Sequence, residues 1–136
     1  MLKGLSHVCF GVEDLDRSVE FYTERVGLRH AFDFTGDDGR RTGAYLHLGG
    51  RTFLELFPGR KGGEGDGSFR HICIEVESME QAVAAFRERG VEVSDPRVGA
   101  DGNPQAWLSD PDGNRIELHE LRPDGLQAKA LARLGV

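Results

Sequence analysis

A short pattern occurs twice in this chain. The segment His-Val-Cys-Phe-Gly-Val-Glu, which begins at His7, recurs 64 residues later as His-Ile-Cys-Ile-Glu-Val-Glu at His71. Glu55, in Phe-Leu-Glu-Leu, recurs 62 residues later as Glu117, in Arg-Ile-Glu-Leu. A duplicated segment places equivalent residues in equivalent positions of a fold. The chain is therefore expected to form two similar halves, each with one histidine and one glutamate that can face a common point.

Histidine nitrogen and glutamate oxygen are both ligands of first-row metal ions. A set of two His and two Glu without cysteine suits nickel, cobalt, manganese, iron or zinc, and it leaves coordination positions open for water or substrate. A divalent ion held in this way can act as a Lewis acid toward a substrate with vicinal oxygens. We therefore predict a metal site whose ligands are His7, Glu55, His71 and Glu117.

Length and charge set limits on partners and location. At 136 residues the chain suits a single domain. The formal net charge of −6, without a cluster of Lys or Arg, argues against nucleic acid as the main partner. No apolar run approaches the ~20 residues of a membrane span, and the first residues lead into a strand pattern instead of a signal peptide. We expect a cytoplasmic protein with a small-molecule partner and no membrane association.

Hydrophobic periodicity predicts the same element order in both halves, namely strand, helix and three strands. Asp14 and Ser78 are predicted helix N-caps, and Gly27 and Gly90 are predicted to end the helices. The predicted strands are 5–12, 28–34, 42–48, 52–57, 69–76, 91–94, 105–109 and 114–120. This order predicts an α+β fold. Its predicted parts are modules 4–58 and 69–121, a glycine-rich linker 58–68, a single domain 1–122 around them, and a helical tail 123–136.

Side-chain alternation separates the two faces of these strands. One face is aliphatic and should pack on the helices. The other face carries the predicted ligands, Cys9 and Cys73, and several aromatic and basic side chains, which indicates a concave, partly dry surface with a ligand pocket. We expect both thiols to be free and mostly buried. The residues predicted to line the pocket are Tyr45, His47, Phe53, Trp107, Arg115 and His119.

Motifs spread over residues 4–121 carry a family resemblance. They are Ser-His7-Val, the stretch Asp14-Leu-Asp-Arg-Ser-Val-Glu-Phe-Tyr22, Gly27-Leu, Leu-Glu55-Leu, His71-Ile, and Asp110-Pro-Asp-Gly-Asn-Arg-Ile-Glu117-Leu. Together they resemble the vicinal oxygen chelate superfamily, which includes glyoxalase I, methylmalonyl-CoA epimerase, extradiol dioxygenases, and fosfomycin and bleomycin resistance proteins. The resemblance implies paired βαβββ modules that form a curved, half-closed antiparallel-type barrel with helices outside and the metal inside. It also implies a homodimer.

The ligand set narrows the implied function. A His/Glu/His/Glu set looks like that of bacterial glyoxalase I, which favours a metal-dependent lyase or isomerase that abstracts a proton from its substrate. Glu117 is the first candidate for the catalytic base and Glu55 the second. The alternatives are an epimerase, an extradiol-type dioxygenase, and a metal-free small-molecule binding or resistance protein of the same fold.

One departure from the glyoxalase pattern concerns glutathione. Relatives that use glutathione are expected to carry basic or amide side chains near the first strand and just after the second ligand. In this chain those places hold Phe10, Gly11, Pro58 and Gly59. The arginines that can substitute for them are Arg41, Arg51 and Arg115. The sequence therefore leaves open a different small oxygenated metabolite as the substrate.

Overall fold

The computed structural model describes residues 5, 7–59 and 71–135. These residues fall into two compact units. The first comprises Met1–Gly65 with Asp110–Asn114, and the second comprises Asp66–Ser109 with Arg115–Val136. Most of the predicted linker at 58–68 lies outside the described residues.

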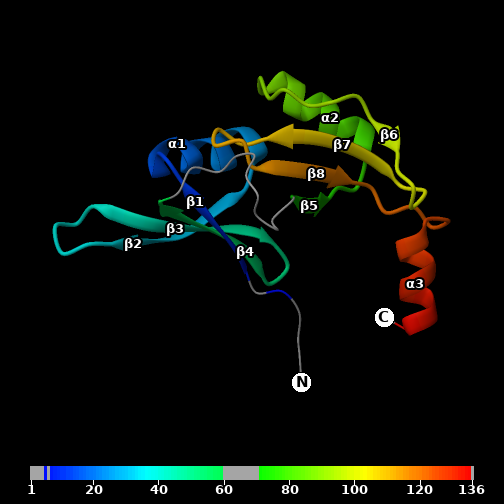
Figure 1. The fold of residues 1–136 in the computed structure, drawn as a ribbon, viewed down its shortest axis with the longest axis horizontal. Coiled ribbons are helices and arrows are strands. Elements are labelled where there is room, and N and C mark those ends of the chain that lie inside the picture. The colour runs from blue at the N-terminus through cyan, green and yellow to red at the C-terminus, as the bar shows by residue number, and fades with distance from the viewer. Residues whose placement is uncertain (1–4, 6, 60–70, 136) are drawn as a thin grey trace. The chain divides into compact units, whose positions relative to one another are not determined.

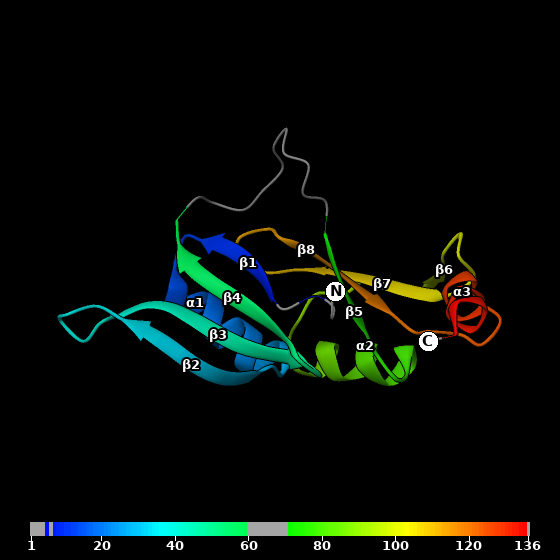
Figure 2. The same cartoon turned by 90° about the horizontal axis from the view of Figure 1, so that it is seen from below.

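The first unit is a four-stranded sheet with a helix on one face (Figure 1). Its elements are β1 (His7–Val12), α1 (Leu15–Glu20), the π-helix η1 (Phe21–Val26), β2 (Arg29–Thr35), β3 (Arg41–Gly49) and β4 (Thr52–Pro58). The strands lie side by side in the order β1-β4-β3-β2, as Figure 2 shows. The outer pair β1–β4 is parallel, and the other pairs are antiparallel.

The second unit repeats this order. Its elements are β5 (Ile72–Glu75), α2 (Met79–Glu88), β6 (Arg97–Val98), β7 (Pro104–Ser109), β8 (Arg115–His119) and α3 (Leu126–Leu134). The strand order is β5-β8-β7-β6, with β5 and β8 parallel, and α2 lies over β7 (Figure 1). The predicted α+β class and βαβββ modules are therefore confirmed. The sheets are mixed and not purely antiparallel. In each unit a helix follows the first strand, and the last strand then returns to pair with the first strand in parallel.

The aliphatic face of each sheet forms the core, as predicted. In the first unit α1 packs against β3 and β4. The buried apolar side chains of the two sheets include Phe10, Val12, Ala44, Leu46, Leu54, Leu56, Ile72, Ala106, Leu108, Ile116 and Leu118. Since strand residues alternate between faces, this packing leaves the odd-numbered positions of β1, β4 and β8 for the opposite face. Among the described residues, no helix is long and apolar enough to span a membrane.

The strand predicted at 91–94 is wrong. The short strand of this region is β6, at Arg97–Val98. At the predicted position the Ser94 amide donates to the Trp107 carbonyl at 2.9 Å, but the Trp107 amide donates to the Ser94 hydroxyl at 3.0 Å. A side chain therefore takes the place of a backbone acceptor, and no ladder forms there.

The tail forms the predicted helix α3. Gly135 ends it with a φ of 71°, the left-handed conformation that glycine adopts without strain. Leu126 and Leu131 on this helix are 60% and 40% exposed.

The turn Asp110–Asn114 is held by a buried hydrogen-bond network. Asp110 accepts from the amides of Asp112 (2.9 Å) and Asn114 (2.8 Å) and from the Asn114 side chain (2.7 Å). The Tyr22 hydroxyl donates to Asp110 at 2.8 Å, and the Ser18 hydroxyl donates to Asp112 at 3.1 Å. Because Tyr22 and Ser18 are fully buried, these bonds satisfy polar groups that would otherwise be costly to bury.

Tyr22→Phe should lower the free energy of unfolding by about 1–3 kcal/mol, because Asp110 loses a buried donor. Burial, and then the charge of Asp110, raise the pKa of Tyr22 far above the value of about 10 that is usual for tyrosine. The difference in free energy of unfolding between the wild type and this variant is thus complete below about pH 10. It decreases as the pH rises further, because Tyr22 then ionises in the unfolded chain but not in the folded protein. Denaturant unfolding at pH 7 and above pH 10 measures both effects, with Tyr45→Phe as the matched control. An equal loss in the two variants would contradict this role of Tyr22.

Candidate metal centre

In the first unit, β1 and β4 bring His7 and Glu55 to the same sheet face. The parallel register places His7 beside Phe53 and Cys9 beside Glu55. The two predicted ligands are therefore one step apart along that face, and His7 Nε2 lies 3.6 Å from Glu55 Oε2. The side chain of Glu55 is 14% exposed and that of His7 is 41% exposed.

The second unit repeats this arrangement in the same register. Cys73 on β5 lies beside Glu117 on β8, and His71 immediately precedes β5. His71 Nε2 lies 3.0 Å from Glu117 Oε2, and the Glu117 side chain is 9% exposed. Each unit thus presents one matched His–Glu pair.

The spacing within each pair fits two ligands of one ion. Two ligand atoms bonded at about 2.1 Å, in octahedral or tetrahedral geometry, lie roughly 3.0–3.4 Å apart. The observed separations of 3.0 and 3.6 Å are close to this range. In the described part of the chain, neither unit contains a group of three or more His, Cys, Asp or Glu side chains that could hold a metal ion. Each pair by itself therefore offers two donor side chains, which do not make a complete metal site.

The two cysteines are free, as predicted, but both are exposed, which corrects the expectation that they are mostly buried. The reason is their place on the ligand-bearing face, which the helices leave uncovered. Partial desolvation of the thiol, and then the nearby Glu55 carboxylate, raise the pKa of Cys9 to about 11. Desolvation and the charge of Glu117 raise the pKa of Cys73 likewise to about 11. In the metal-free protein both thiols are therefore protonated at neutral pH and poor nucleophiles.

An aromatic side chain lies directly across from each glutamate. Tyr45 pairs with Glu55 in the β3–β4 register, and Trp107 pairs with Glu117 in the β7–β8 register. A hydrogen bond with the Glu55 carboxylate, followed by desolvation, raises the pKa of Tyr45.

The predicted pocket residues Trp107 and Arg115 both lie beside the second pair. The Trp107 ring meets the His71 ring edge-on at 4.9 Å between centroids. The Arg115 guanidinium lies 4.3 Å above the Trp107 ring, a cation–π contact. The Trp107 ring on β7 therefore contacts both His71 and Arg115.

Two other predicted pocket residues, Phe53 and His47, lie toward the β3–β4 turn. The Phe53 ring is 5.8 Å from the Tyr45 ring and 5.6 Å from that of His47. His47 is engaged at both ring nitrogens, with Arg29 and with the Gly50 carbonyl, each at 3.1 Å. His47 therefore belongs to the end of the sheet and not to the His7–Glu55 pair.

His119 is buried on the Glu117 face and bonded to a group that the sequence analysis missed. Its Nε2 lies 3.1 Å from Asp101 Oδ2. Asp101 also accepts from Asn103 at 3.0 Å and from Gln127, on α3, at 2.7 Å. Hydrogen bonds from Asn103 and Gln127 hold the pKa of Asp101 well below its usual range. No sequence periodicity links these residues, so only the fold reveals that α3 contributes to the surroundings of His119.

The sequence analysis also missed two aromatic residues of the first unit, Phe32 and Phe34. A β-bulge between His30 and Phe32 shifts the alternation of β2, so that Phe32 pairs with Tyr45 and Phe34 with Gly43. Both rings therefore lie on the face of His7 and Glu55. The alternating Phe-Asp-Phe pattern shows that the two rings share a face, but the bulge decides which face that is.

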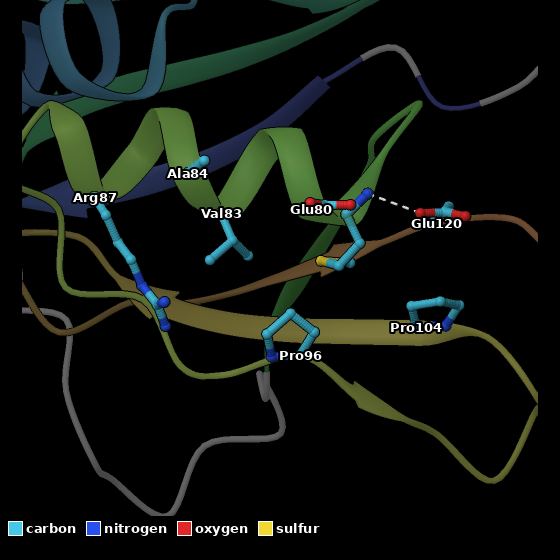
Figure 3. Close-up of a pocket in the computed structure, with 8 residues that line it drawn as sticks. Glu80, Val83, Ala84, Arg87, Pro96, Pro104 and Glu120 are labelled. Carbon is cyan, nitrogen blue, oxygen red and sulfur yellow. Dashed lines mark hydrogen bonds between the residues drawn. The ribbon is translucent and has the colours of Figure 1, made fainter.

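A shallow groove of about 490 Å³ lies elsewhere in the second unit (Figure 3). It runs along α2, between Val83 and Ala84 on the helix and Pro96 and Pro104 opposite. Because α2 covers the aliphatic face of the sheet, strand alternation puts this groove on the opposite side from Glu117. The groove is thus separate from the His–Glu pair of its unit.

Arg41, one of the three arginines that can substitute in glutathione binding, already has partners. It forms ion pairs with Asp16 at 2.9 Å and with Asp33 at 3.1 Å. Arg115 is held over Trp107. Arg51 is exposed in the turn between β3 and β4.

The family model of the Glyoxalase/Bleomycin resistance protein/Dioxygenase superfamily matches residues 4–118. The chain belongs to this superfamily. The vicinal oxygen chelate resemblance inferred from the motifs is therefore confirmed, and the two βαβββ modules described above are the fold of this glyoxalase-type chain.

Relatives within the superfamily carry different activities. The metallothiol transferase FosB of Staphylococcus epidermidis is 32% identical over 127 residues, which cover 87% of this chain and 82% of FosB. The lactoylglutathione lyase of Salmonella typhimurium is 27% identical over 128 residues, covering 89% of this chain and 95% of the lyase. The solved structure of TnmS3, an antibiotic binding protein from a Streptomyces species, is 28% identical, with a TM-score of 0.70 and coverage of 89% and 98%.

The two thiols provide a separate test of the surroundings of each His–Glu pair. In metal-free protein, alkylation of Cys9 and Cys73 by iodoacetamide should follow apparent pKa values of about 11. Glu55→Gln should lower the pKa of Cys9 and leave Cys73 unchanged, because a neighbouring carboxylate disfavours the thiolate. Glu117→Gln should do the reverse. The rates are measured by peptide mass spectrometry across pH, and an equal response of both thiols to either variant would contradict the described pairing.

Proposed function

We propose that this protein is a divalent-metal-dependent, glyoxalase-like lyase or isomerase that acts on a small substrate with vicinal oxygens by proton abstraction. The ligands in this proposal are His7 and Glu55 from the first unit and His71 and Glu117 from the second. The proposal holds equally for two pairs from one chain and for pairs from two chains of a homodimer.

The matched register of the two His–Glu pairs is the observation that supports it most. The histidine begins the outer parallel strand in the first unit and immediately precedes it in the second, and in both units the glutamate lies on the neighbouring strand beside a cysteine. Two halves without a shared task would not need to keep the same pair of donor atoms 3.6 and 3.0 Å apart. The lyase relative, similar along almost its whole length, supports the reaction class.

The chain's own residues would divide the chemistry among them. When bound, the divalent ion would supply Lewis acidity that makes the C–H bond beside a chelated carbonyl more acidic. Glu117 would accept that proton on a carboxylate oxygen and return it to the neighbouring carbon, while the electron pair stays within the substrate. Glu55 is the second candidate for this role. Tyr45 lies across from Glu55, and Trp107 lies across from Glu117.

The substrate that we propose is a small oxygenated metabolite other than a glutathione adduct. At the places where glutathione-using relatives are expected to be basic or polar, Phe10 is buried and Pro58 ends β4. Arg41 is already paired with two aspartates. A hemithioacetal of glutathione would therefore lack a cationic partner for its carboxylates on β1 and β4.

We also propose a homodimer. Leu126 and Leu131 on α3 expose apolar surface that a second chain would cover.

Glu117→Gln should reduce turnover about 100-fold or more, the scale of a lost general base, and should weaken binding of the divalent ion because one charged ligand is gone. Glu92→Gln, a change at an exposed position of the same unit, is the control and should leave both properties unchanged. Metal affinity is measured by competition with a chelator, and turnover with the metal-loaded protein. Near-normal turnover in the Glu117 variant would remove Glu117 from the proposed role.

Metal content separates the proposed enzyme from a binding protein of the same fold. Protein purified without chelator and offered nickel, cobalt, manganese, iron or zinc should retain one ion per chain. If it retains none, the alternative of a metal-free binding protein, like the antibiotic binding relative, replaces the enzyme. If the protein retains an ion, thioester formation from a hemithioacetal and oxygen consumption with catechols under ferrous iron distinguish glyoxalase from dioxygenase chemistry.

A further inference from the structure

The first unit carries a continuous row of aromatic rings on the same sheet face as His7 and Glu55. We call this row the aromatic wall. Its members come from β2, β3 and β4 and are Phe32, Phe34, Tyr45, Phe53 and Phe57. All five side chains are uncharged, and the wall lies entirely within one unit.

The rings are arranged as offset and edge-on pairs. Phe32 stacks on Tyr45 with 4.6 Å between centroids and 16° between planes, and Phe34 stacks on Phe57 at 5.4 Å and 29°. The Phe34 and Tyr45 rings meet edge-on at 5.8 Å. Such pairs are favourable beyond the area that they bury, and they hold each ring in a defined orientation. The ring contacts therefore give the wall a defined geometry.

Two backbone features build the wall. The bulge between His30 and Phe32 turns Phe32 and Phe34 to this face. Gly43 leaves room for the Phe57 ring, because a Cβ atom at this position would lie 2.8 Å from Cδ1 of that ring. An aromatic ring lying over a strand glycine stabilises the sheet at that point. The bulge and Gly43 thus allow aromatic rings to lie on a sheet face that is not part of the hydrophobic core.

The wall is exposed at one end and reaches the metal-ligand pair at the other. Phe32 and Phe34 are 46% and 40% exposed. At the inner end the Tyr45 ring lies 5.6 Å from the His7 ring, and Tyr45 pairs with Glu55 in the β3–β4 register. A ligand that lies flat along the exposed rings would therefore have its nearest polar atoms beside His7 and Glu55.

We propose that the aromatic wall binds a planar aromatic substituent of the substrate, so that the substrate class is an aryl compound with vicinal oxygens on the carbon chain next to the ring. This inference rests on the proposed function and names the substrate of the same site. An aromatic ring is selected over an aliphatic group because its π-face and edge match the stacked and edge-on geometry of the wall. A carbohydrate or an aliphatic hydroxy acid would leave this apolar surface in contact with polar groups or water.

The first experiment tests the wall without metal. Chelator-treated protein is titrated with 2-naphthylmethanol and, in parallel, with its saturated decahydro analogue, and binding is followed by NMR chemical shifts. The aromatic probe should bind about three-fold or more tightly than the saturated one, the scale of one well-stacked ring pair. Phe32→Leu and Phe34→Leu should each reduce this ratio toward one. Phe21→Leu, the same change on the helix η1, should leave the ratio unchanged.

The second experiment adds the oxygens. Metal-loaded protein is titrated calorimetrically with mandelate and hexahydromandelate, which share an α-hydroxy carboxylate and differ only in the ring. A preference for mandelate that Phe32→Leu abolishes supports the inference. If the protein retains no metal but the naphthyl preference persists, the wall stands and the proposed function fails. If both hydroxy acids bind equally to the metal-loaded protein, or if self-association that Phe32→Leu abolishes blocks the probe, the inference is overturned.

Discussion

The parallel pairing of the first and last strands of each unit is the interaction on which the site depends. In β1–β4 and β5–β8 the register sets a glutamate beside a cysteine, and the histidine stands two residues before that cysteine. A shift by one residue would turn every side chain of a strand to the other face. The burial of the aliphatic residues therefore fixes the register, and the register in turn fixes the distance between histidine and glutamate.

The two units use the opposite face of their sheets in different ways. Both place an aromatic residue across from the glutamate, Tyr45 in one case and Trp107 in the other. The first unit extends its aromatic residue into a wall of rings, whereas the second surrounds its own with Arg115 and the His119–Asp101 network. A duplicated fold thus keeps the donor atoms alike and lets the neighbouring side chains diverge, which is how one scaffold can serve several substrates.

The repeat in the sequence was enough to predict the βαβββ order and to place the His–Glu pairs on one face, because period-two alternation and helix caps are local signals. The prediction failed where the chain departs from regular strands. The bulge before Phe32 hid two wall residues, and the Ser94 hydroxyl replaced a backbone acceptor where a strand was expected. The link from Asp101 to Gln127 joins residues 26 apart in the sequence, and no local pattern encodes such a partner.

The number of imidazoles on the bound ion tests the duplicated half-sites most directly. Elemental analysis of the nickel-loaded protein should give one ion per chain, and its X-ray absorption spectra should show two imidazole ligands, since each His–Glu pair supplies one histidine. His7→Ala and His71→Ala should each leave one imidazole. Two ions per chain, or an imidazole count that only one of the two variants changes, would contradict a centre built equally from both halves.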